Sequence, residues 1–245
     1  MVGWGRGVVS RAAGPGAGSV RGLRWLASVG PAPVAAWATA MGWAMPTAYP
    51  HAARLQSMGW VERCAMTQGE GSLLYATRAG VEMSGVVAVP LAGVPAPATW
   101  GHWVACAWTA AWLSARGREL VGAREVLLDE FWRGEVSWSE RGGVRRRGHR
   151  PDLAAGLSPD GPLLPIEVEL ASKSMVRLRA ILGLHAAWIA AGKTAAVIYV
   201  CGGERVAARV REQAAQVGLG VERRTLRVEL LETVRAQALA AREAT

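Results

Sequence analysis

A short alternation of apolar and acidic residues constrains the fold of this chain more than any other feature. Residues 166–170 read IEVEL, and the side chains of a β-strand point alternately to opposite faces. The pattern therefore predicts a strand with one packed face and one open face that carries both Glu167 and Glu169. Asp152 lies upstream, and the glycine- and proline-rich stretch after it predicts a turn between two antiparallel strands. Such a hairpin would bring the three carboxylates together.

The three carboxylates predict a metal site. Carboxylates that face one another repel unless a cation lies among them, and clusters of oxygen ligands suit Mg²⁺ or Mn²⁺. Lys173 follows the predicted strand, in a chain that has only one other lysine and otherwise uses arginine. We interpret Asp152, the two glutamates and Lys173 as a metal-dependent phosphodiesterase site. The competing interpretation is an exposed strand face with a surface ion pair between Glu169 and Lys173.

The charge of the chain indicates a polyanionic partner. The formal net charge is +9, which fits nucleic acid or an acidic membrane surface, although arginine-rich chains also arise from GC-rich coding. Three scattered cysteines form neither a metal-binding spacing nor a disulfide framework, so a reducing compartment is expected. No stretch has the length needed to span a bilayer, and no secretory signal is recognisable. We therefore expect a cytoplasmic protein that binds DNA and no membrane.

The chain divides into four predicted segments. They are a disordered basic tail (residues 1–20), a helical module with a hairpin (21–95), a second domain (96–232) and a fraying helical tail (233–245). In the module, apolar residues recur at helical spacing in three stretches that end at Gly30, Gly42 and Gly59, and two short strands then flank a glycine-rich turn. Prolines between 90 and 97 mark a linker, which places the domain boundary near residue 95.

The second domain alternates helices and strands, which predicts an α/β (α+β) fold. Tryptophans at helical spacing in a helix at 100–116 indicate a core-facing stripe. A helix at 123–132 carries Glu125, which is either solvated or a further carboxylate of the site. The basic run at 141–150 leads into Asp152 and is either a solvated loop or a loop that holds a phosphate backbone. The remaining predicted elements are two helices (175–191, 206–217) and two strands (194–201, 221–231).

The first domain resembles a known DNA-binding fold. Three helices followed by a hairpin is the order of a winged helix, and the run RLQSMGWVER…LLYATRAG resembles the winged-helix pattern of bacterial regulators. The resemblance implies that the third helix enters the DNA major groove and that arginines contact phosphates. It assigns DNA contacts to Thr47, Tyr49, His51, Arg54, Arg63 and Arg78. Winged helices also serve as protein–protein modules, and this alternative stays open.

The second domain resembles the core of the PD-(D/E)XK restriction-endonuclease-like superfamily. Asp152 and the Glu167-x-Glu169 pair lie where that motif is expected, although Glu169 stands in the usual lysine position. With the winged helix in front, the chain is similar to the replication-relaxation family, which is related to the MOB-C relaxases. The family pattern is an aspartate, then E-x-E-x-x-x-K, then an arginine four residues on. The matching residues are Asp152, Glu167, Glu169, Lys173 and Arg177.

This resemblance implies a strand-nicking endonuclease of a mobile element, acting in plasmid mobilisation or replication. The three carboxylates would bind Mg²⁺ or Mn²⁺. Lys173 would orient the attacking water, and Arg177 would hold a phosphate. Tyr199 is a counterpart of a tyrosine that the family carries near the following strand. The basic residues that would position the duplex, together with the winged helix, are Arg145, Arg146, Arg147 and Arg150.

The alternative function is a catalytically inactive DNA-binding accessory protein or transcriptional regulator that uses a nuclease-like domain for assembly. Metal-dependent nicking of supercoiled plasmid separates these two functions. A homodimer, and complexes with other transfer or replication proteins of a mobile element, are compatible with both.

Overall fold

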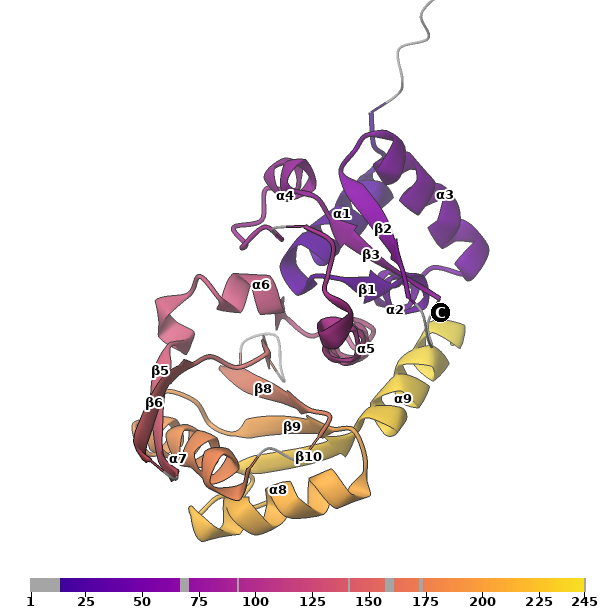
Figure 1. Ribbon diagram of the computed structural model, residues 1–245. Coiled ribbons are helices and arrows are strands. Elements are labelled where there is room, and N and C mark those ends of the chain that lie inside the picture. The colour runs from indigo at the N-terminus through magenta and orange to yellow at the C-terminus, as the bar shows by residue number, and fades with distance from the viewer. Residues whose placement is uncertain are drawn as a thin grey trace, which may run out of the picture.

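The computed structural model combines helices with several sheets, as the predicted α+β class requires (Figure 1). The structure describes residues 14–66, 71–91, 93–140, 142–156, 161–171 and 174–244. Within these ranges, no helix has both the length and the apolar character needed to cross a membrane.

The N-terminal part packs helices on a small antiparallel sheet. Its elements are α1 (Ala17–Val29), β1 (Ala32–Pro33), α2 (Val34–Met41), α3 (Met45–Ser57), β2 (Val61–Ala65), β3 (Ser72–Ala76) and α4 (Arg78–Ser84). The strands lie in the order β1-β3-β2. The three predicted helices and the predicted hairpin are present, and β1 and α4 are additional.

The predicted N-terminal tail is too long. Helix α1 begins at Ala17, and it packs on the core through Leu23 and Leu26, which are fully buried. Residues 17–20 therefore belong to a helix, and residues 1–13 lie outside the described ranges.

The second part is built on a five-stranded sheet. Its elements are η1 (Pro97–Thr99), α5 (Trp100–Ser114), β4 (Leu120–Val121), α6 (Ala123–Val126), η2 (Glu130–Trp132), β5 (Gly134–Glu140), β6 (Gly143–His149), β7 (Leu153–Gly156), β8 (Leu163–Glu169), α7 (Met175–Ala190), β9 (Val197–Cys201), α8 (Glu204–Gln216), β10 (Leu226–Leu230) and α9 (Leu231–Glu243). The sheet order is β10-β9-β8-β7-β4, in which β8, β9 and β10 are parallel and β7 is antiparallel to both of its neighbours. Figure 1 shows α7 and α8 on one side of this sheet and α5 on the other.

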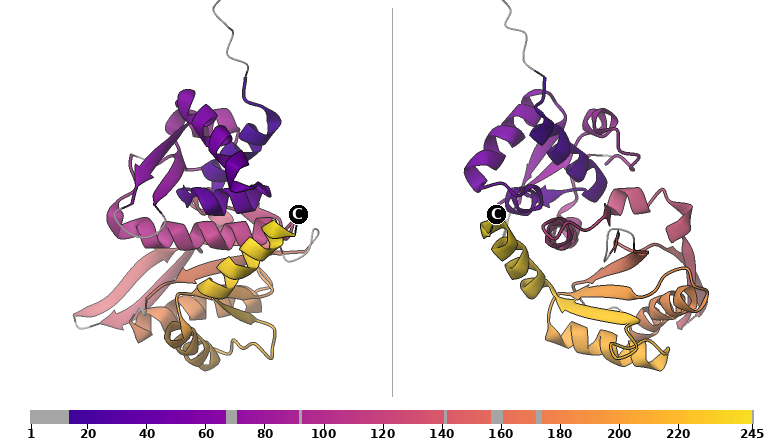
Figure 2. Two further views of the ribbon diagram at one scale, coloured as in Figure 1. Left: turned by 90° about the vertical axis from the view of Figure 1, so that its right-hand side faces the viewer. Right: turned by 180° about the vertical axis from the view of Figure 1, so that it is seen from behind.

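Two predictions for this part need correction. The helix expected at 123–132 is broken into α6 and η2, because the side chain of Asp129 accepts a hydrogen bond from the Phe131 amide and starts a new turn. The basic run is not a loop: most of it forms β6, which pairs with β5 in a two-stranded ribbon. Figure 2 shows the turn end of this ribbon extending away from the body of the protein.

The base of the ribbon lies close against α7. A Cβ atom at Gly134 would lie 2.5 Å from the Cδ2 atom of Leu184, so glycine allows β5 to start at this distance from the helix. Gly134 pairs with His149 across the ribbon. The close approach therefore places His149 at the junction between the ribbon, α7 and the five-stranded sheet.

One apolar core runs through both parts of the chain. Leu26 and Trp37 from the N-terminal helices, Trp108 from α5 and Ile166 from β8 belong to the same buried cluster. Helix α5 contacts α2 as well as β7 and β8, which confirms that its tryptophan stripe faces the core. The core is thus continuous across the predicted domain boundary near residue 95.

The C-terminal residues form a helix, as predicted, but this helix is packed and not a fraying tail. Helix α9 lies against α5, and Val234 and Ala238 are fully buried. The indole Nε1 of Trp112 donates a hydrogen bond of 2.9 Å to Oε1 of Gln237. These contacts make α9 part of the core.

Candidate functional site

The predicted hairpin between Asp152 and the acidic strand is present. Strands β7 and β8 are antiparallel, with Leu153 opposite Ile166. Asp152 is held to β8 twice, because its amide donates to the Ile166 carbonyl at 3.0 Å and its Oδ2 accepts from the Val168 amide at 2.7 Å. The hairpin therefore fixes Asp152 beside the middle of β8.

Glu167 and Glu169 lie on the same face of β8, as the alternation predicts, but that face is not open. Glu167 pairs in register with Tyr199 of β9, and helices α7 and α8 cover this side of the sheet. Glu167 is 2% exposed and Glu169 is 3% exposed. The prediction of an open face is wrong, because β8 is an interior strand and the α7 crossover lies over its acidic side.

Two histidines converge on one oxygen of Glu167. The Nε2 atom of His149, from β6, lies 2.7 Å from Oε1 of Glu167, and the Nε2 atom of His185, from α7, lies 2.8 Å from the same oxygen. Burial opposes ionisation of Glu167, but the charge and hydrogen bond of His149, with those of His185, outweigh it and hold the pKa of this carboxyl well below its usual range. Glu167 is therefore a buried, ionised carboxylate.

A second cluster surrounds Asp152. The Nε2 atom of His102 lies 3.1 Å from Oδ1 of Asp152, and the Sγ atom of Cys106 lies 3.5 Å from the same imidazole nitrogen. His102 and Cys106 are four residues apart on α5 and thus share a helical face. Burial, followed by the negative charges of Asp152 and Glu167, raises the pKa of the Cys106 thiol well above its ordinary value.

These contacts change the expected set of metal ligands. Among the described residues, two groups bring three candidate ligand atoms within 4.8 Å of one another: His102, Cys106 and Asp152 in one, and His149, Glu167 and His185 in the other. Asp152 and Glu167 fall into different groups, and Glu169 falls into neither. The predicted carboxylates thus have nitrogen and sulfur atoms of His102, Cys106, His149 and His185 as neighbours, and these residues were not among the predicted ligands.

The missed residues had a signal in the sequence, although a weak one. The chain contains four histidines, and three of them, His102, His149 and His185, lie in these two groups. The step from His102 to Cys106 places both on one helical face, and His149 precedes Asp152 by three residues. Histidine is rare enough in this chain for its positions to be informative.

The predicted carboxylates line a cleft of about 540 Å³. Asp152, Glu167 and Glu169 contribute to its wall, together with His102 and His149. Tyr199 lies next to Glu167 on the neighbouring strand β9. Burial, then the charges of Glu167, Glu169 and Asp152, raises the pKa of this phenol well above its ordinary value. The hydroxyl of Tyr199 has no hydrogen-bond partner among the described residues.

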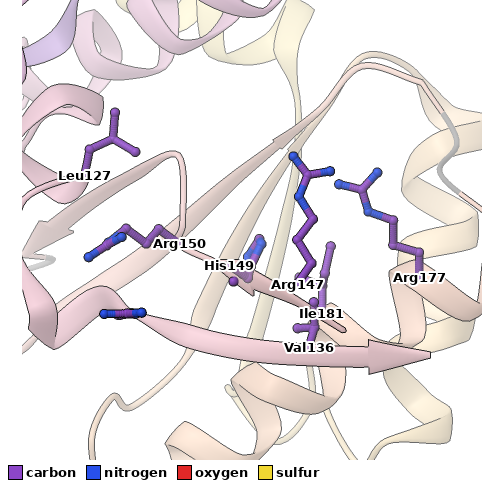
Figure 3. Close-up of a pocket in the computed structure, with 9 residues that line it drawn as sticks. Leu127, Val136, Arg147, His149, Arg150, Arg177 and Ile181 are labelled. Atoms are coloured by element: carbon purple, nitrogen blue, oxygen red, sulfur yellow. The ribbon is translucent and has the colours of Figure 1, made fainter. Parts of the chain in front are cut away.

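A basic pocket of about 410 Å³ adjoins this cleft (Figure 3). The arginines that line it are Arg133, Arg147, Arg150 and Arg177. His149, Arg150 and Arg177 line both the pocket and the cleft. In Figure 3, the guanidinium groups of Arg147 and Arg177 point in the same direction, whereas Arg150 points away from them. Arg150 instead pairs with Glu130 at 2.8 Å.

The arginines of the ribbon lie on two different faces. Arg147 pairs with Val136, and Arg145 pairs with Trp138, so these side chains share the face that carries His149. Arg146 pairs with Ser137 and lies on the opposite face. The guanidinium group of Arg177 lies 5.8 Å from the ring centre of Trp138. The face with Arg145 and Arg147 is therefore the one that leads to the cleft.

Helix α3 presents some of the predicted DNA contacts to solvent. Thr47 and Tyr49 are exposed. His51 stacks on Trp43 with ring centres 4.2 Å apart and forms a hydrogen bond of 2.8 Å with Ser19. His51 thus joins α3 to α1 through packing contacts.

The three predicted arginine contacts of this part differ in their surroundings. Arg54 donates to the Gly14 carbonyl. Arg63 is exposed in the middle of β2, opposite Leu74 of β3. Arg78 is the first residue of α4 and therefore lies beyond the hairpin. Its side chain lies 3.6 Å from Glu82 in a surface ion pair.

Two further candidates stand apart from the site. The carboxylate of Glu125 accepts hydrogen bonds from the Ser28 hydroxyl and the Gly122 amide, so it caps α6 and joins it to α1. Lys173 lies outside the described residues, and its predicted role stays a prediction.

Comparisons with known proteins add no relative: no family model matches the chain, and no curated protein or solved structure matches it.

Proposed function

We propose that this protein binds DNA and cuts one strand of it in the cleft that Asp152 and Glu167 line. The observation that carries the proposal is the junction of this cleft with the basic pocket. Arg147 and Arg177 line the pocket beside ionisable groups that can bind a divalent ion, and guanidinium groups hold phosphate in a bidentate manner. A phosphodiester in the pocket would have its neighbouring phosphate in the cleft.

The order of elements supports the proposed nuclease class. An initial helix (α5), antiparallel strands that carry Asp152 and then Glu167-x-Glu169, a helix (α7) and a parallel strand (β9) follow the order that the PD-(D/E)XK resemblance implies. In the N-terminal part, helix, strand, two helices and a hairpin follow the order of a winged helix. Both likenesses are part of the proposal.

The residues of the cleft fit a divalent ion. Asp152 and Glu167 have other potential ligands within 4.8 Å, and the buried Tyr199 hydroxyl beside them lacks a partner among the described residues. Asp152 and Glu167, each with its own neighbouring ligands, would hold the ion, and the ion would lower the pKa of a bound water and offset charge on the phosphate. Arg177 would hold the phosphate, and Lys173 would orient the water.

Nicking of supercoiled plasmid with Mg²⁺ or Mn²⁺ tests the proposal. We expect Asp152→Asn to lose nicking by at least about 100-fold, because this change removes a carboxylate charge that acts on the reacting phosphate. We expect Lys173→Ala to lose nicking as well, with DNA affinity unchanged in both variants. Asp129→Asn is the matched control, because an asparagine at the exposed start of η2 still accepts the capping hydrogen bond.

A specific observation favours the second candidate, a DNA-binding accessory protein that does not cut. Glu167 and Glu169 are 2% and 3% exposed, and one oxygen of Glu167 already accepts hydrogen bonds from two histidines. If the wild-type protein binds plasmid DNA but nicks it with neither Mg²⁺ nor Mn²⁺, whichever transfer or replication origin the plasmid carries, the accessory function replaces the nuclease.

A further inference from the structure

We propose that His149, Glu167 and His185 form a binding site for Zn²⁺, a borderline transition metal ion, and not for Mg²⁺. The zinc site shares Glu167 with the proposed nuclease centre. The binding of the ion is argued from the geometry alone, and only the role of the ion in nicking rests on the proposed function. Its basis is the convergence of two imidazole nitrogens and one carboxylate oxygen from β6, β8 and α7.

The donor set decides the class of metal. Imidazole nitrogens suit Zn²⁺, whereas Mg²⁺ prefers oxygen ligands and retains water. Two histidines and one glutamate are three protein ligands, the number that leaves a fourth position of tetrahedral Zn²⁺ open. The donor set therefore favours Zn²⁺ over Mg²⁺ and leaves one position for an exchangeable ligand.

The distances are close to those that a zinc ion needs. Ligand atoms around tetrahedral Zn²⁺ lie about 3.3 Å from one another, given bonds of about 2.0–2.1 Å. The two Nε2 atoms lie 2.7 Å and 2.8 Å from Oε1 of Glu167. The side chains would have to separate by about half an ångström, which rotation about their side-chain bonds can provide.

The surroundings supply both burial and access. The side chain of His185 is 0% exposed and that of Glu167 is 3% exposed, whereas His149 is 14% exposed. His149 and Glu167 line the 540 Å³ cleft, so an ion would enter from that side and its open position would face the cleft.

Two buried polar atoms near the site lack a hydrogen-bond partner among the described residues. Nδ1 of His185 and the hydroxyl of Tyr199 have no hydrogen-bond partner among the described residues, and the two rings are in edge contact at 6.4 Å. A buried polar atom without a partner costs about 1–3 kcal/mol, and an ion or a bound water is a common reason for one.

The neighbouring group is the weaker candidate. The group around Asp152 is more open to solvent, because the side chain of Asp152 is 23% exposed, compared with 3% for Glu167. His102 is 43% exposed, so its imidazole is well solvated. The group around Asp152 therefore does not compete as the zinc site.

The test measures metal binding by the full chain, independently of nicking. The protein is stripped with a chelator and then titrated with Zn²⁺, with Co²⁺ as a spectroscopic probe of nitrogen ligation. We expect one Zn²⁺ per chain, retained in a large excess of Mg²⁺. His149→Gln should lower the affinity at least about tenfold and change the visible spectrum of bound Co²⁺, because glutamine keeps a hydrogen-bond donor to Glu167 but is a poor ligand.

The controls separate ligand loss from misfolding. His51→Gln removes an imidazole that stacks on Trp43 in the N-terminal part, and it should leave zinc binding unchanged. His185→Gln should reproduce the effect of His149→Gln, and circular dichroism identifies any variant that fails to fold. If His185→Gln fails to fold, His149→Gln still decides the test, because His149 is less buried than His185.

Two results overturn the zinc site. One is a wild-type protein that binds neither Zn²⁺ nor Co²⁺, and the other is a folded His149→Gln protein that binds both as the wild type does. If either result is obtained and the His149→Gln protein still nicks DNA with Mg²⁺, the zinc site is ruled out and the proposed nuclease function stands. Zinc binding as expected, without nicking by any metal, would retain the zinc site and remove the nuclease.

Discussion

The Nε2 atom of His149 lies 2.7 Å from the Oε1 atom of Glu167, although the two residues belong to different sheets. His149 is the last residue of β6 in the exposed ribbon, and Glu167 is buried in the middle of the five-stranded sheet. This contact joins the basic ribbon to the acidic cleft. The position of the ribbon arginines therefore depends on the same carboxylate that is central to the candidate site.

Loss of this contact should loosen the ribbon. We expect His149→Ala to lower the free energy of unfolding by about 1–3 kcal/mol, because it leaves a buried ionised carboxylate with one fewer hydrogen bond. Hydrogen exchange at the amides of β5 and β6 should become faster, and urea unfolding measures the loss of stability. Arg146→Ala, on the opposite face of the ribbon, is the control. Unchanged exchange in the ribbon of His149→Ala would show that the packing against α7 alone holds it.

The two faces of the ribbon should differ in DNA binding. Arg147 lines the basic pocket and Arg145 lies on the same face of the ribbon, so we expect the double change to alanine to remove two phosphate contacts. Each lost contact lowers the slope of log affinity against log salt by about 0.9, so we expect a decrease of about 2. Fluorescence anisotropy at several salt concentrations measures the slope. Arg146→Ala should change the salt slope less than Arg145→Ala or Arg147→Ala does. An equal effect from Arg146→Ala would contradict the assignment of the two faces.

Helix α9 should contribute to global stability. Val234 is fully buried against the core, and its change to alanine should cost about 2 kcal/mol through lost burial and a residual cavity. Val221→Ala is the matched control, because Val221 is 57% exposed and should change stability by less than about 0.5 kcal/mol. Urea denaturation followed by tryptophan fluorescence compares them. Equal midpoints for the two variants would mean that α9 frays, as its sequence alone suggests.

Two buried phenols should resist ionisation until the protein unfolds. Burial, then the hydrogen bond and charge of Glu62, raises the pKa of Tyr75 above its ordinary value of 10.0. Burial and Glu167 act in the same direction on Tyr199. A raised pKa in the folded state means that the stability from each phenol is fully present below about pH 10 and is lost as the pH rises above it.

Ultraviolet absorbance during alkaline titration tests this expectation. Ionisation of Tyr75 and Tyr199 should coincide with the loss of the circular dichroism signal. Tyr75→Phe and Tyr199→Phe should each reduce the amplitude of that cooperative step by one phenol. Gradual ionisation of both before any loss of structure would contradict their burial.

Local patterns in the sequence predicted much of the fold. The helices that end at Gly30, Gly42 and near Gly59 follow from apolar spacing and glycine stops, and they are present with small shifts in their bounds. The hairpin that places Asp152 beside β8 follows from alternation and a glycine-rich turn. These features are determined within short stretches of chain, so the sequence by itself contained them.

Only the tertiary structure decided what surrounds the carboxylates. The alternation in β8 showed that Glu167 and Glu169 share a face, but whether that face meets water depends on where α7 crosses the sheet. His102, His149 and His185 come from three elements far apart in the chain, and no local period relates them. Their meeting depends on the packing of α5, the ribbon and α7 around one sheet, because long-range contacts and not local propensities bring these elements together.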